Sequence, residues 1–339
     1  MYIKKIKGKN ISGDIMCTAV TFAADNFYFG RTLDYEKSFG ESIALTPRNY
    51  AFNFTNGKNV SRHYAILGMS HIEKDYPLYY DAFNEKGLSV AGLNFVGNAC
   101  YNETKKDAEN VAVFELIPYI LSLCKNVAEA KEILYKTNIT ATPFNEKLGT
   151  ASLHWIIADK NECITVEAVK EGLKVYENRV GVLTNNPPFK EQMHRLNDYM
   201  YLSAKSPQNN FSDKLDFSCY SRGMGAMGLP GDFSSSSRFV RAVFIKMNSP
   251  TLDSEEENVG QFFHIMDSVA QPLGSVMVEK DEYEKTIYTS CINADKGIYY
   301  YTSYSNRQIN AVNMYREDLN GQRLKTFELL CEQKINGQN

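Results

Sequence analysis

The feature that most constrains the fold is a set of strand-like segments joined by short turns. Residues 17–34 alternate apolar and polar positions around Asp25–Asn26, which predicts a β-hairpin. Residues 153–169 form a second such pair across Lys160–Asn161, and residues 172–178 extend it into a meander. Strands that follow one another this closely pair antiparallel, because a parallel crossover needs a dozen or more residues.

The C-terminal part of the chain repeats this pattern. Residues 286–315 predict three strands with turns at Asp295–Lys296 and Asn306–Arg307. We expect both ends of the chain to share one sheet region and the central pair to belong to a second set of strands.

Helical periodicity occupies the segments between these strands. Because the strands and helices show no regular β-α-β spacing, the sequence predicts an antiparallel, layered α+β fold. The stretch 203–231, rich in Ser, Asn, Gly and Asp, is the best candidate for a long surface loop. The helical segments are 111–124, which contains Pro118, then 127–135, 189–201 and 260–269.

Composition restricts the class of protein. The 339 residues are 43% hydrophobic and 23% charged, which is enough to bury a sizeable core in one or two domains. The formal net charge is -3 and there is no long Lys/Arg run, so nucleic-acid binding is not expected.

The cysteines point to a reducing compartment. They number seven, are scattered and form no C-x-x-C pair, so neither a disulfide framework nor a zinc site is indicated. No apolar run approaches the roughly 20 residues of a membrane span, and the lysines near the start precede no apolar signal segment. We therefore expect a cytoplasmic protein without stable membrane association and without a metal.

Cys17 directly follows Met16, so removal of residues 1–16 would leave a cysteine at the new N-terminus. A small buried hydrophobe in the first strand is the alternative role for this residue. The choice between the two depends on residues further along the chain.

A series of blocks carries a family resemblance that extends from Met16 nearly to the C-terminus. In order, they are MCTAVTF, FGRTLDYEKSFGESIALTPRNY, YAILGM, DYPLYYDAFNEKGLSVAGLNF, LHWIIAD, GVLTNNP, GLPGDFSSSSRFVR and TSCINADKGIYYYTSYSNRQINAV. A chain with these blocks in this order resembles the choloylglycine hydrolase family, which contains bile salt hydrolases and penicillin V acylases.

The resemblance implies a four-layer αββα sandwich of antiparallel sheets, the N-terminal nucleophile hydrolase fold. It also implies a cysteine that acts as nucleophile through its thiol and as base through its own amino group, with no cofactor and in a homotetramer. The residues that the resemblance places at the catalytic site are Cys17, Arg31, Asp34, Asn94, Asn185 and Arg238.

These residue types have the chemical properties that amide hydrolysis by a thiolate requires. The guanidinium groups of Arg31 and Arg238 would favour the thiolate of Cys17. Asparagine N–H donors would stabilise the oxyanion of a tetrahedral intermediate, by about 3 kcal/mol per donor in other hydrolases. Asp34 follows Arg31 by three residues, so on a regular strand it faces the opposite side, and a turn or bulge would be needed to bring it to the amino group.

Ordinary structural roles compete with these assignments. Arg31 and Asp34 could form a partly exposed ion pair, each asparagine could be a turn residue, and Arg238 could satisfy the end of the apolar helix that follows SSSS. A histidine could serve as the base for a cysteine, but none lies in a recognisable protease signature, so structural or surface roles are expected. The histidines are His63, His71, His154, His194 and His264.

A sterol-sized amide needs an apolar cleft. By analogy with the family, Leu33, Phe144 and Leu148 line it, with Tyr80 and Phe95 as weaker additions. Burial in the core is the competing interpretation of all five, since apolar side chains are ordinarily buried.

The substrate expected from the resemblance is a conjugated bile acid. Asn94 in AGLNF favours this over penicillin V, because acylases that prefer phenoxyacetyl substrates often carry tyrosine there. A penicillin V acylase is the second possibility, and a non-catalytic homologue that binds amphiphiles is a third. We expect a single domain over 17–339, with residues 1–16 either a propeptide that is removed or the product of a misassigned start at which Met16 is the true first residue.

Overall fold

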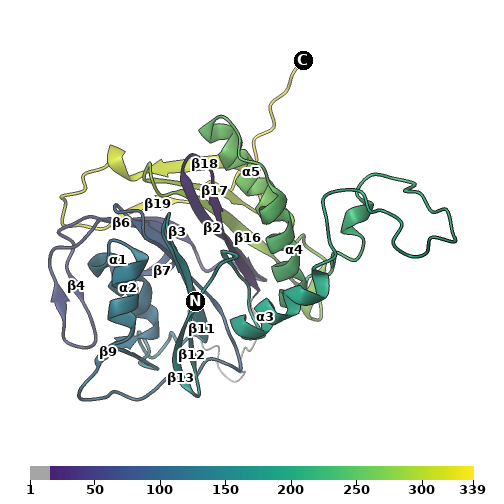
Figure 1. The fold of residues 1–339 in the computed structure, drawn as a ribbon. Helices are drawn as coiled ribbons and strands as arrows, with labels where there is room; N and C mark the ends of the chain where they lie inside the picture. The colour runs from purple at the N-terminus through teal and green to yellow at the C-terminus, as the bar shows by residue number, and fades with distance from the viewer. Residues whose placement is uncertain (1–15) are drawn as a thin grey trace.

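The computed structural model describes residues 16–339, so the expected leader, apart from Met16, lies outside the described residues. Two antiparallel sheets lie face to face, with helices on both outer sides (Figure 1). The first sheet contains, in order, β14 (Val182–Leu183), β1 (Cys17–Ala23), β2 (Phe27–Tyr35), β16 (Glu282–Asn293), β17 (Ile298–Ser303) and β18 (Asn306–Asn313), with β15 (Val276–Glu279) paired to β16.

The second sheet contains the central hairpins. Its order is β13 (Gly172–Glu177), β12 (Cys163–Val169), β11 (Leu153–Ala158), β8 (Ser89–Asn94), β7 (Tyr76–Asn84), β6 (Ile66–Glu73), β3 (Ser42–Thr46) and β19 (Lys325–Glu328). Two small pairs flank it, β4 (Phe52–Asn53) with β5 (Asn59–Val60) and β9 (Glu109–Ala112) with β10 (Thr137–Thr140). The predicted sharing of one sheet by the two ends of the chain is confirmed, because β2 pairs with β16.

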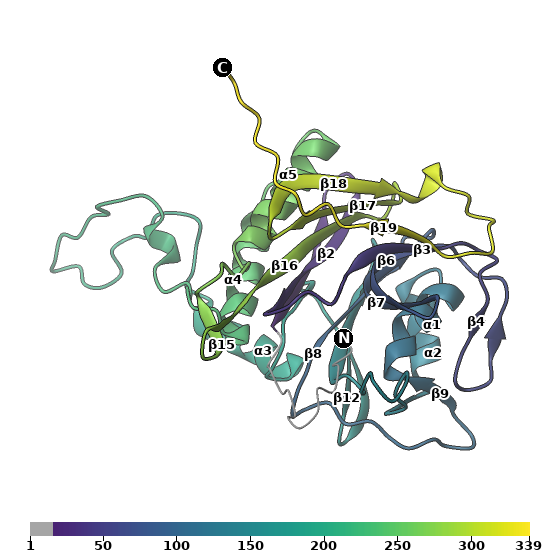
Figure 2. The same cartoon turned by 180° about the vertical axis from the view of Figure 1, so that it is seen from behind.

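The helices complete four layers, so the predicted αββα architecture is confirmed (Figures 1 and 2). On the second sheet lie α1 (Leu116–Leu123) and α2 (Val127–Leu134), whereas α4 (Ser235–Asn248) and α5 (Glu255–Asp267) cover the first sheet, near α3 (Phe189–Arg195). Short 3-10 turns span Val113–Glu115, Leu196–Tyr199, Met224–Ala226 and Met314–Arg316.

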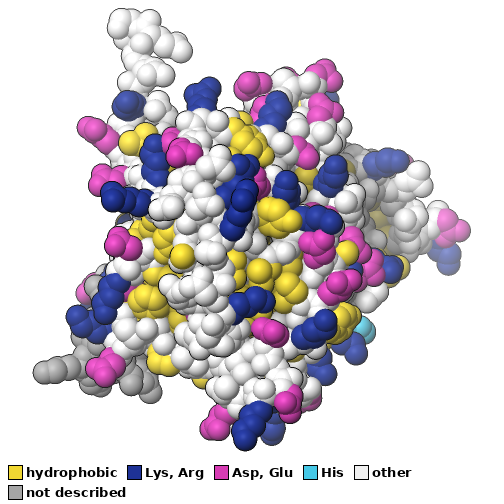
Figure 3. All heavy atoms as spheres, turned by 90° about the vertical axis from the view of Figure 1, so that its left-hand side faces the viewer, with side chains coloured by type: hydrophobic (Ala, Val, Ile, Leu, Met, Phe, Trp, Pro, Cys, Tyr) yellow, Lys and Arg dark blue, Asp and Glu magenta, His cyan; other side chains and the backbone are white. Residues whose placement is uncertain are grey.

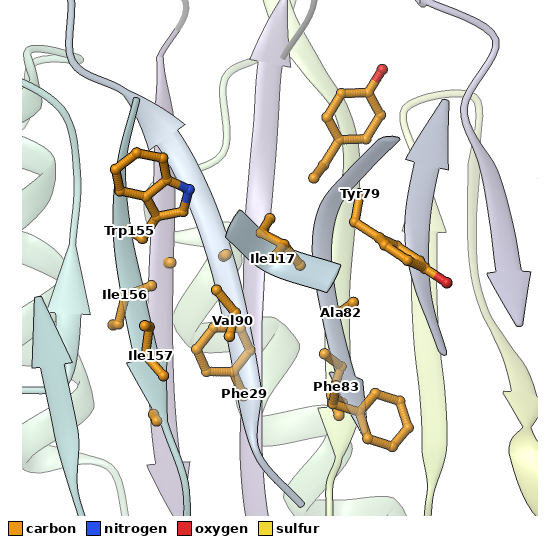
Figure 4. Close-up of a cluster of buried hydrophobic side chains, with 14 of the residues drawn as sticks. Phe29, Tyr79, Ala82, Phe83, Val90, Ile117, Trp155, Ile156 and Ile157 are labelled. Atoms are coloured by element: carbon orange, nitrogen blue, oxygen red, sulfur yellow. The ribbon is translucent and has the colours of Figure 1, made fainter. Parts of the chain in front are cut away.

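The core fills the space between the two sheets and beneath α1. Phe29 from β2, Val90 from β8 and Trp155 from β11 are fully buried, and Figure 4 shows them in one cluster with Ile117 of α1. On the face that carries α1 and α2, Lys/Arg and Asp/Glu side chains are interspersed around apolar ones (Figure 3). This face therefore shows no single-sign surface of the kind that a polyanion needs.

Several predicted boundaries were wrong. The helix expected over 111–124 starts only at Leu116, because residues 109–112 form β9 and pair with a distant strand. Pro118 lies in the first turn of α1, where a missing N–H does no harm. The last hairpin turns at 304–305 rather than at Asn306–Arg307, since Asn306 already pairs with Ser303.

Two other helices also differ in extent. The helix expected over 260–269 begins at Glu255, after a capping box formed by Ser254 and Glu257. The helix expected over 189–201 ends at Arg195 and continues as a 3-10 turn. The predicted loop 203–231 is confirmed, and it projects from the body as an arm between α3 and α4 (Figures 1 and 2).

Candidate active site

Cys17 opens β1 on the inner face of the first sheet, where its side chain is completely buried. Its Sγ accepts a hydrogen bond of 2.5 Å from Nη2 of Arg31. The rest of the guanidinium donates to three carbonyl oxygens, from Nε to Thr32 at 3.1 Å and from Nη1 to Tyr80 at 3.2 Å and Gly92 at 2.6 Å. Arg31 is thus held against the sulfur by the backbone of both sheets.

Gly30 permits the close strand approach that places Arg31. A Cβ atom on Gly30 would lie 2.0 Å from the carbonyl oxygen of Ser290 on β16. Any larger residue would push β2 away from β16 and displace the guanidinium that follows it in sequence.

Arg238 reaches Cys17 from the helix side of the same sheet. Its Nη1 donates to the carbonyl oxygen of Cys17 at 2.7 Å and to Oγ1 of Thr18 at 2.5 Å, and its Nη2 donates to Oδ1 of Asn185 at 2.8 Å. The helix starts within SSSS rather than after it, because α4 begins at Ser235 and Arg238 lies in its first turn.

Asn185 links the other candidates. Its Oδ1 also accepts the backbone N–H of Cys17 at 2.8 Å, and its Nδ2 donates to the carbonyl oxygen of Asn94 at 2.8 Å. The backbone N–H of Asn185 donates to Oγ of Ser235 at 2.8 Å. Asn185 therefore joins the start of β1, the end of β8 and the N-terminus of α4.

Asp34 adjoins the residue before Cys17. Its backbone N–H donates to the carbonyl oxygen of Met16 at 3.0 Å, while its carboxylate accepts from the hydroxyls of Thr286 at 2.6 Å and Thr32 at 3.0 Å. The expected irregularity exists, but it lies in the partner strand: Leu33 pairs with Tyr288 and Asp34 with Thr286, so β16 has one extra residue there.

Burial and the two arginines shift the pKa values of the site in opposite directions. Burial raises the pKa of the Cys17 thiol, although the charges of Arg31 and Arg238 lower it. Burial likewise raises the pKa of Asp34 against the effect of Arg238. The arginines therefore act in the expected direction, but with residues 16 and 17 joined the thiol remains favoured over the thiolate.

Glu284 is a site residue that the sequence did not indicate. It is 2% exposed, and its Oε1 accepts the backbone N–H of Met16 at 2.8 Å. Burial, and then the charge of Asp34, raise its pKa to about 8. Its segment, DEYEK, looks like an exposed charged run, so no sequence signal separates Glu284 from its neighbours.

The five apolar candidates fall into different places. Leu33 pairs with Cys17 across β1 and β2 and is buried. Tyr80 is 3% exposed, and Phe95 is fully buried with its ring stacked on His154 at 4.3 Å. Phe144 and Leu148 belong instead to a separate apolar cluster with Leu78, Ala112 and Phe114.

His154 contacts the candidate site directly, because its ring stacks on Phe95. Its Nδ1 pairs with Oε1 of Glu167 at 3.1 Å and its Nε2 with the carbonyl oxygen of Thr184 at 2.8 Å. Thr184 precedes Asn185, so this buried pair supports the asparagine from behind and fits the expected structural role.

The described residues contain neither a metal-binding cluster nor a membrane-spanning helix. Within residues 16–339, no group of three or more His, Cys, Asp or Glu side chains is arranged to hold a metal ion. No helix of that same part of the chain has the length and apolar character needed to cross a membrane.

Comparison with known proteins identifies relatives along almost the whole chain. Residues 17–327 match the family described as linear amide C–N hydrolases, choloylglycine hydrolase family. The bile salt hydrolase/transferase of Lactiplantibacillus plantarum is 50% identical over 317 residues, which cover 94% of this chain and 98% of that protein.

Solved structures give the same picture. A crystal structure of a cysteine-to-alanine mutant of the conjugated bile acid hydrolase from Clostridium perfringens superposes with a TM-score of 0.88 at 37% identity, covering 95% of this chain and all of that one. The penicillin V acylase from Agrobacterium tumefaciens superposes with a TM-score of 0.75, covering 92% of this chain and 91% of that one. At 20% identity, the second likeness establishes the fold alone.

Proposed function

Because this chain belongs to the choloylglycine hydrolase family of linear amide C–N hydrolases, we propose that it cleaves the amide bond of glycine- or taurine-conjugated bile acids. The observation that carries the proposal is the 50% identity to a bile salt hydrolase/transferase over 98% of that protein's length. Identity at this level over a whole chain supports a shared substrate class as well as a shared fold.

In the proposed reaction, Cys17 is the nucleophile. Its sulfur attacks the substrate amide carbon, its proton passes through the amino group of Cys17 to the leaving amine, and a thioester forms as glycine or taurine departs. Water then attacks the thioester, gives up a proton to the same amino group, and releases the free bile acid and the thiol. An amine that replaced water in this second step would instead receive the acyl group and form a new amide.

This mechanism requires Cys17 to be the first residue of the active protein. With Met16 attached, the nitrogen of Cys17 is a peptide N–H that donates to Asn185, and a peptide nitrogen is not basic. A free α-amine, with an ordinary pKa of about 7.7 to 8.0, suits proton transfer near neutral pH. We therefore propose that residues 1–16 are absent from the active form and that 17–339 is the working domain.

The supporting residues take complementary roles. Arg31 stabilises the thiolate, since it already donates to the sulfur, and Arg238 holds the backbone of Cys17. Asn94 and Asn185 supply donors to the oxyanion, and Asp34 orients the amino group. Among the apolar candidates, we assign Phe144 and Leu148 to contacts with the sterol, while Leu33, Tyr80 and Phe95 shape the cleft near the sulfur.

A hydrolysis assay tests the substrate. Release of glycine from glycocholate and of taurine from taurocholate is measured beside the hydrolysis of penicillin V, each with and without a chelator. We expect bile salts to be cleaved faster than penicillin V and the chelator to have no effect. Faster turnover of penicillin V would make the chain an acylase, and binding of bile salts without any hydrolysis would make it an amphiphile-binding homologue.

We also propose a homotetramer in the cytoplasm. The arm between α3 and α4 exposes Phe211 and Tyr220 by more than 80%, and apolar side chains on a projecting segment favour contact with a second copy. All seven cysteines are free, as suits a reducing compartment.

Light scattering after size exclusion tests the assembly. The double variant Phe211→Ser and Tyr220→Ser should yield smaller species. The control Tyr135→Ser, which removes a side chain that is 79% exposed on α2's C-terminal end, should leave the mass unchanged. A monomeric unmodified protein would rule out the tetramer.

A further inference from the structure

A buried carboxylate, Asp81, is linked to Arg31 through a shared hydrogen-bond partner. Asp81 is on β7 of the second sheet and is completely buried, and its carboxylate crosses to the first sheet. There it accepts hydrogen bonds from the hydroxyls of Tyr288 at 2.5 Å, Tyr299 at 2.8 Å and Ser290 at 3.0 Å. Burial raises the pKa of the Asp81 carboxyl, and Arg31 and these three hydroxyl donors oppose that effect, since they stabilise the ionised form.

The same cluster contacts Arg31 at two points. Oγ of Ser290 accepts the backbone N–H of Arg31 at 3.0 Å while its own proton goes to Asp81. Tyr80, the neighbour of Asp81 in sequence, accepts from the guanidinium through its carbonyl oxygen at 3.2 Å. The position of Asp81 is therefore coupled to both the backbone and the side chain of Arg31.

Arg31 needs a counter-charge that its own hydrogen bonds do not supply. The guanidinium is 1% exposed, and its hydrogen-bond acceptors are three carbonyl oxygens and the Cys17 sulfur. A buried cation without a nearby anion is costly. Asp34, the other carboxylate of the site, is balanced chiefly by Arg238 and the hydroxyls of Thr286 and Thr32.

We propose that Asp81 is a positioning residue that supplies the buried counter-charge of Arg31 and so limits how strongly Arg31 attracts the Cys17 thiolate. This inference rests on the proposed role of Cys17 as nucleophile. Burial would lower the pKa of Arg31, but the ionised forms of Cys17, Tyr288, Asp81 and Asp34 oppose this and raise it overall, and among them Asp81 lies in the hydrogen-bonded cluster that contacts Arg31. Without Asp81, the field of Arg31 at the sulfur would be less compensated.

The test follows the ionisation of Cys17 rather than hydrolysis. Protein whose N-terminus has been established by intact mass is treated with iodoacetamide over a range of pH, and alkylation of the Cys17 peptide is quantified by mass spectrometry. The titratable or charged groups that face Cys17 are Arg31, Asp34 and Arg238, and those that face Asp81 are Arg31, Tyr288 and Tyr299. In Asp81→Asn these all remain, and we expect the alkylation midpoint to fall by about one pH unit.

The matched control is Asp159→Asn. Asp159 is also a buried carboxylate, but it accepts backbone N–H groups of Val127, Asn161 and Glu162 away from Arg31. Its variant should keep the midpoint of the unmodified protein. An unchanged or raised midpoint in Asp81→Asn would overturn the proposal and leave Asp81 as a link between the two sheets.

A milder variant covers the case in which Asp81→Asn does not fold. Tyr299→Phe removes one hydroxyl dipole that screens the Asp81 carboxylate, so the negative field at Arg31 strengthens and the alkylation midpoint should rise by a smaller amount. No shift in a folded Tyr299→Phe protein would count against the proposal. Alkylation of Cys17 needs no bile salt. The role of Asp81 can therefore be tested even if the protein hydrolyses no bile salt, and the proposed function and the proposed role of Asp81 can fail separately.

Discussion

The two buried arginines at Cys17 lie on opposite sides of the first sheet and bind different parts of the same residue. Arg31 comes from β2 on the inner side and donates to the sulfur. Arg238 comes from α4 on the helix side and donates to the carbonyl oxygen of Cys17, to Thr18 and to Asn185. One arginine is therefore placed to act on the charge of the thiol, and the other on the geometry of the backbone that carries it.

The pKa values of the two guanidinium groups are also shifted in opposite directions. Burial lowers the pKa of Arg238 although Asp34 opposes this, whereas the surrounding negative groups outweigh burial at Arg31 and raise its pKa. Two residues of one type, at one site and with similar burial, are thus distinguished by the side of the first sheet from which they approach Cys17.

The largest effect is expected at the residue that both arginines hold. Cys17→Ala should lose activity by about 10⁴-fold or more, because no other group can form the thioester. Cys17→Ser keeps a weaker nucleophile and should retain slight activity. Intact mass of active protein should show Cys17 as the first residue. Full activity with residues 1–16 still attached would exclude the amino group as base and would return attention to the histidines.

Replacement of each arginine by glutamine tests the division of roles directly. Arg31→Gln should raise the pH midpoint of Cys17 alkylation by about 1 to 2 units, because the nearest positive charge is lost. Arg238→Gln should raise it less and should lower turnover by releasing the carbonyl of Cys17. Equal midpoint shifts in the two variants would show that the arginines are not specialised.

The asparagines should give the next largest effect. Asn185→Ala and Asn94→Ala should each lower kcat by about 10²-fold with little change in KM, since oxyanion donors act mainly in the transition state. Leu148→Ala serves as the contrast, because an apolar contact should alter KM and the preference among bile acids instead. Wild-type kcat in both asparagine variants would contradict the oxyanion assignment.

The smallest effect is expected in the free energy of unfolding, which should depend on pH through the buried carboxyl of Glu284. Its pKa rises from 4.5 to about 8 on folding, so the folded protein holds this proton where the unfolded chain has lost it. The resulting stabilisation is complete below pH 4.5 and disappears as the pH rises through 8.

Glu284→Gln should remove this dependence, which we expect to be on the order of 3 to 4 kcal/mol between pH 5 and pH 8. Urea unfolding at both pH values measures it. Glu282→Gln, in the exposed part of the same strand, provides the control. An unmodified protein whose stability does not fall relative to Glu284→Gln over this range would show that Glu284 is ionised throughout.

Local patterns were sufficient for much of the fold. The hairpins at Asp25–Asn26, Lys160–Asn161 and Asp295–Lys296 were predictable because alternation and turn residues act over a few positions. The last turn was misplaced by two residues, since Asn306 is a good turn residue by type but pairs with Ser303 in the structure. Residues 111–112 were assigned to a helix for a related reason, because their partner strand β10 lies beyond two helices in the sequence.

The sequence by itself determined the family and the layered fold, and it identified Cys17 and the five residues that we propose act with it. Only the tertiary structure decided which arginine meets the sulfur, that burial raises the pKa of the thiol, and that Asp81 and Glu284 lie beside the same site. These properties depend on strand pairing, on which side of a sheet a side chain faces, and on burial. Each is set by segments up to 268 positions apart, and no local pattern records them.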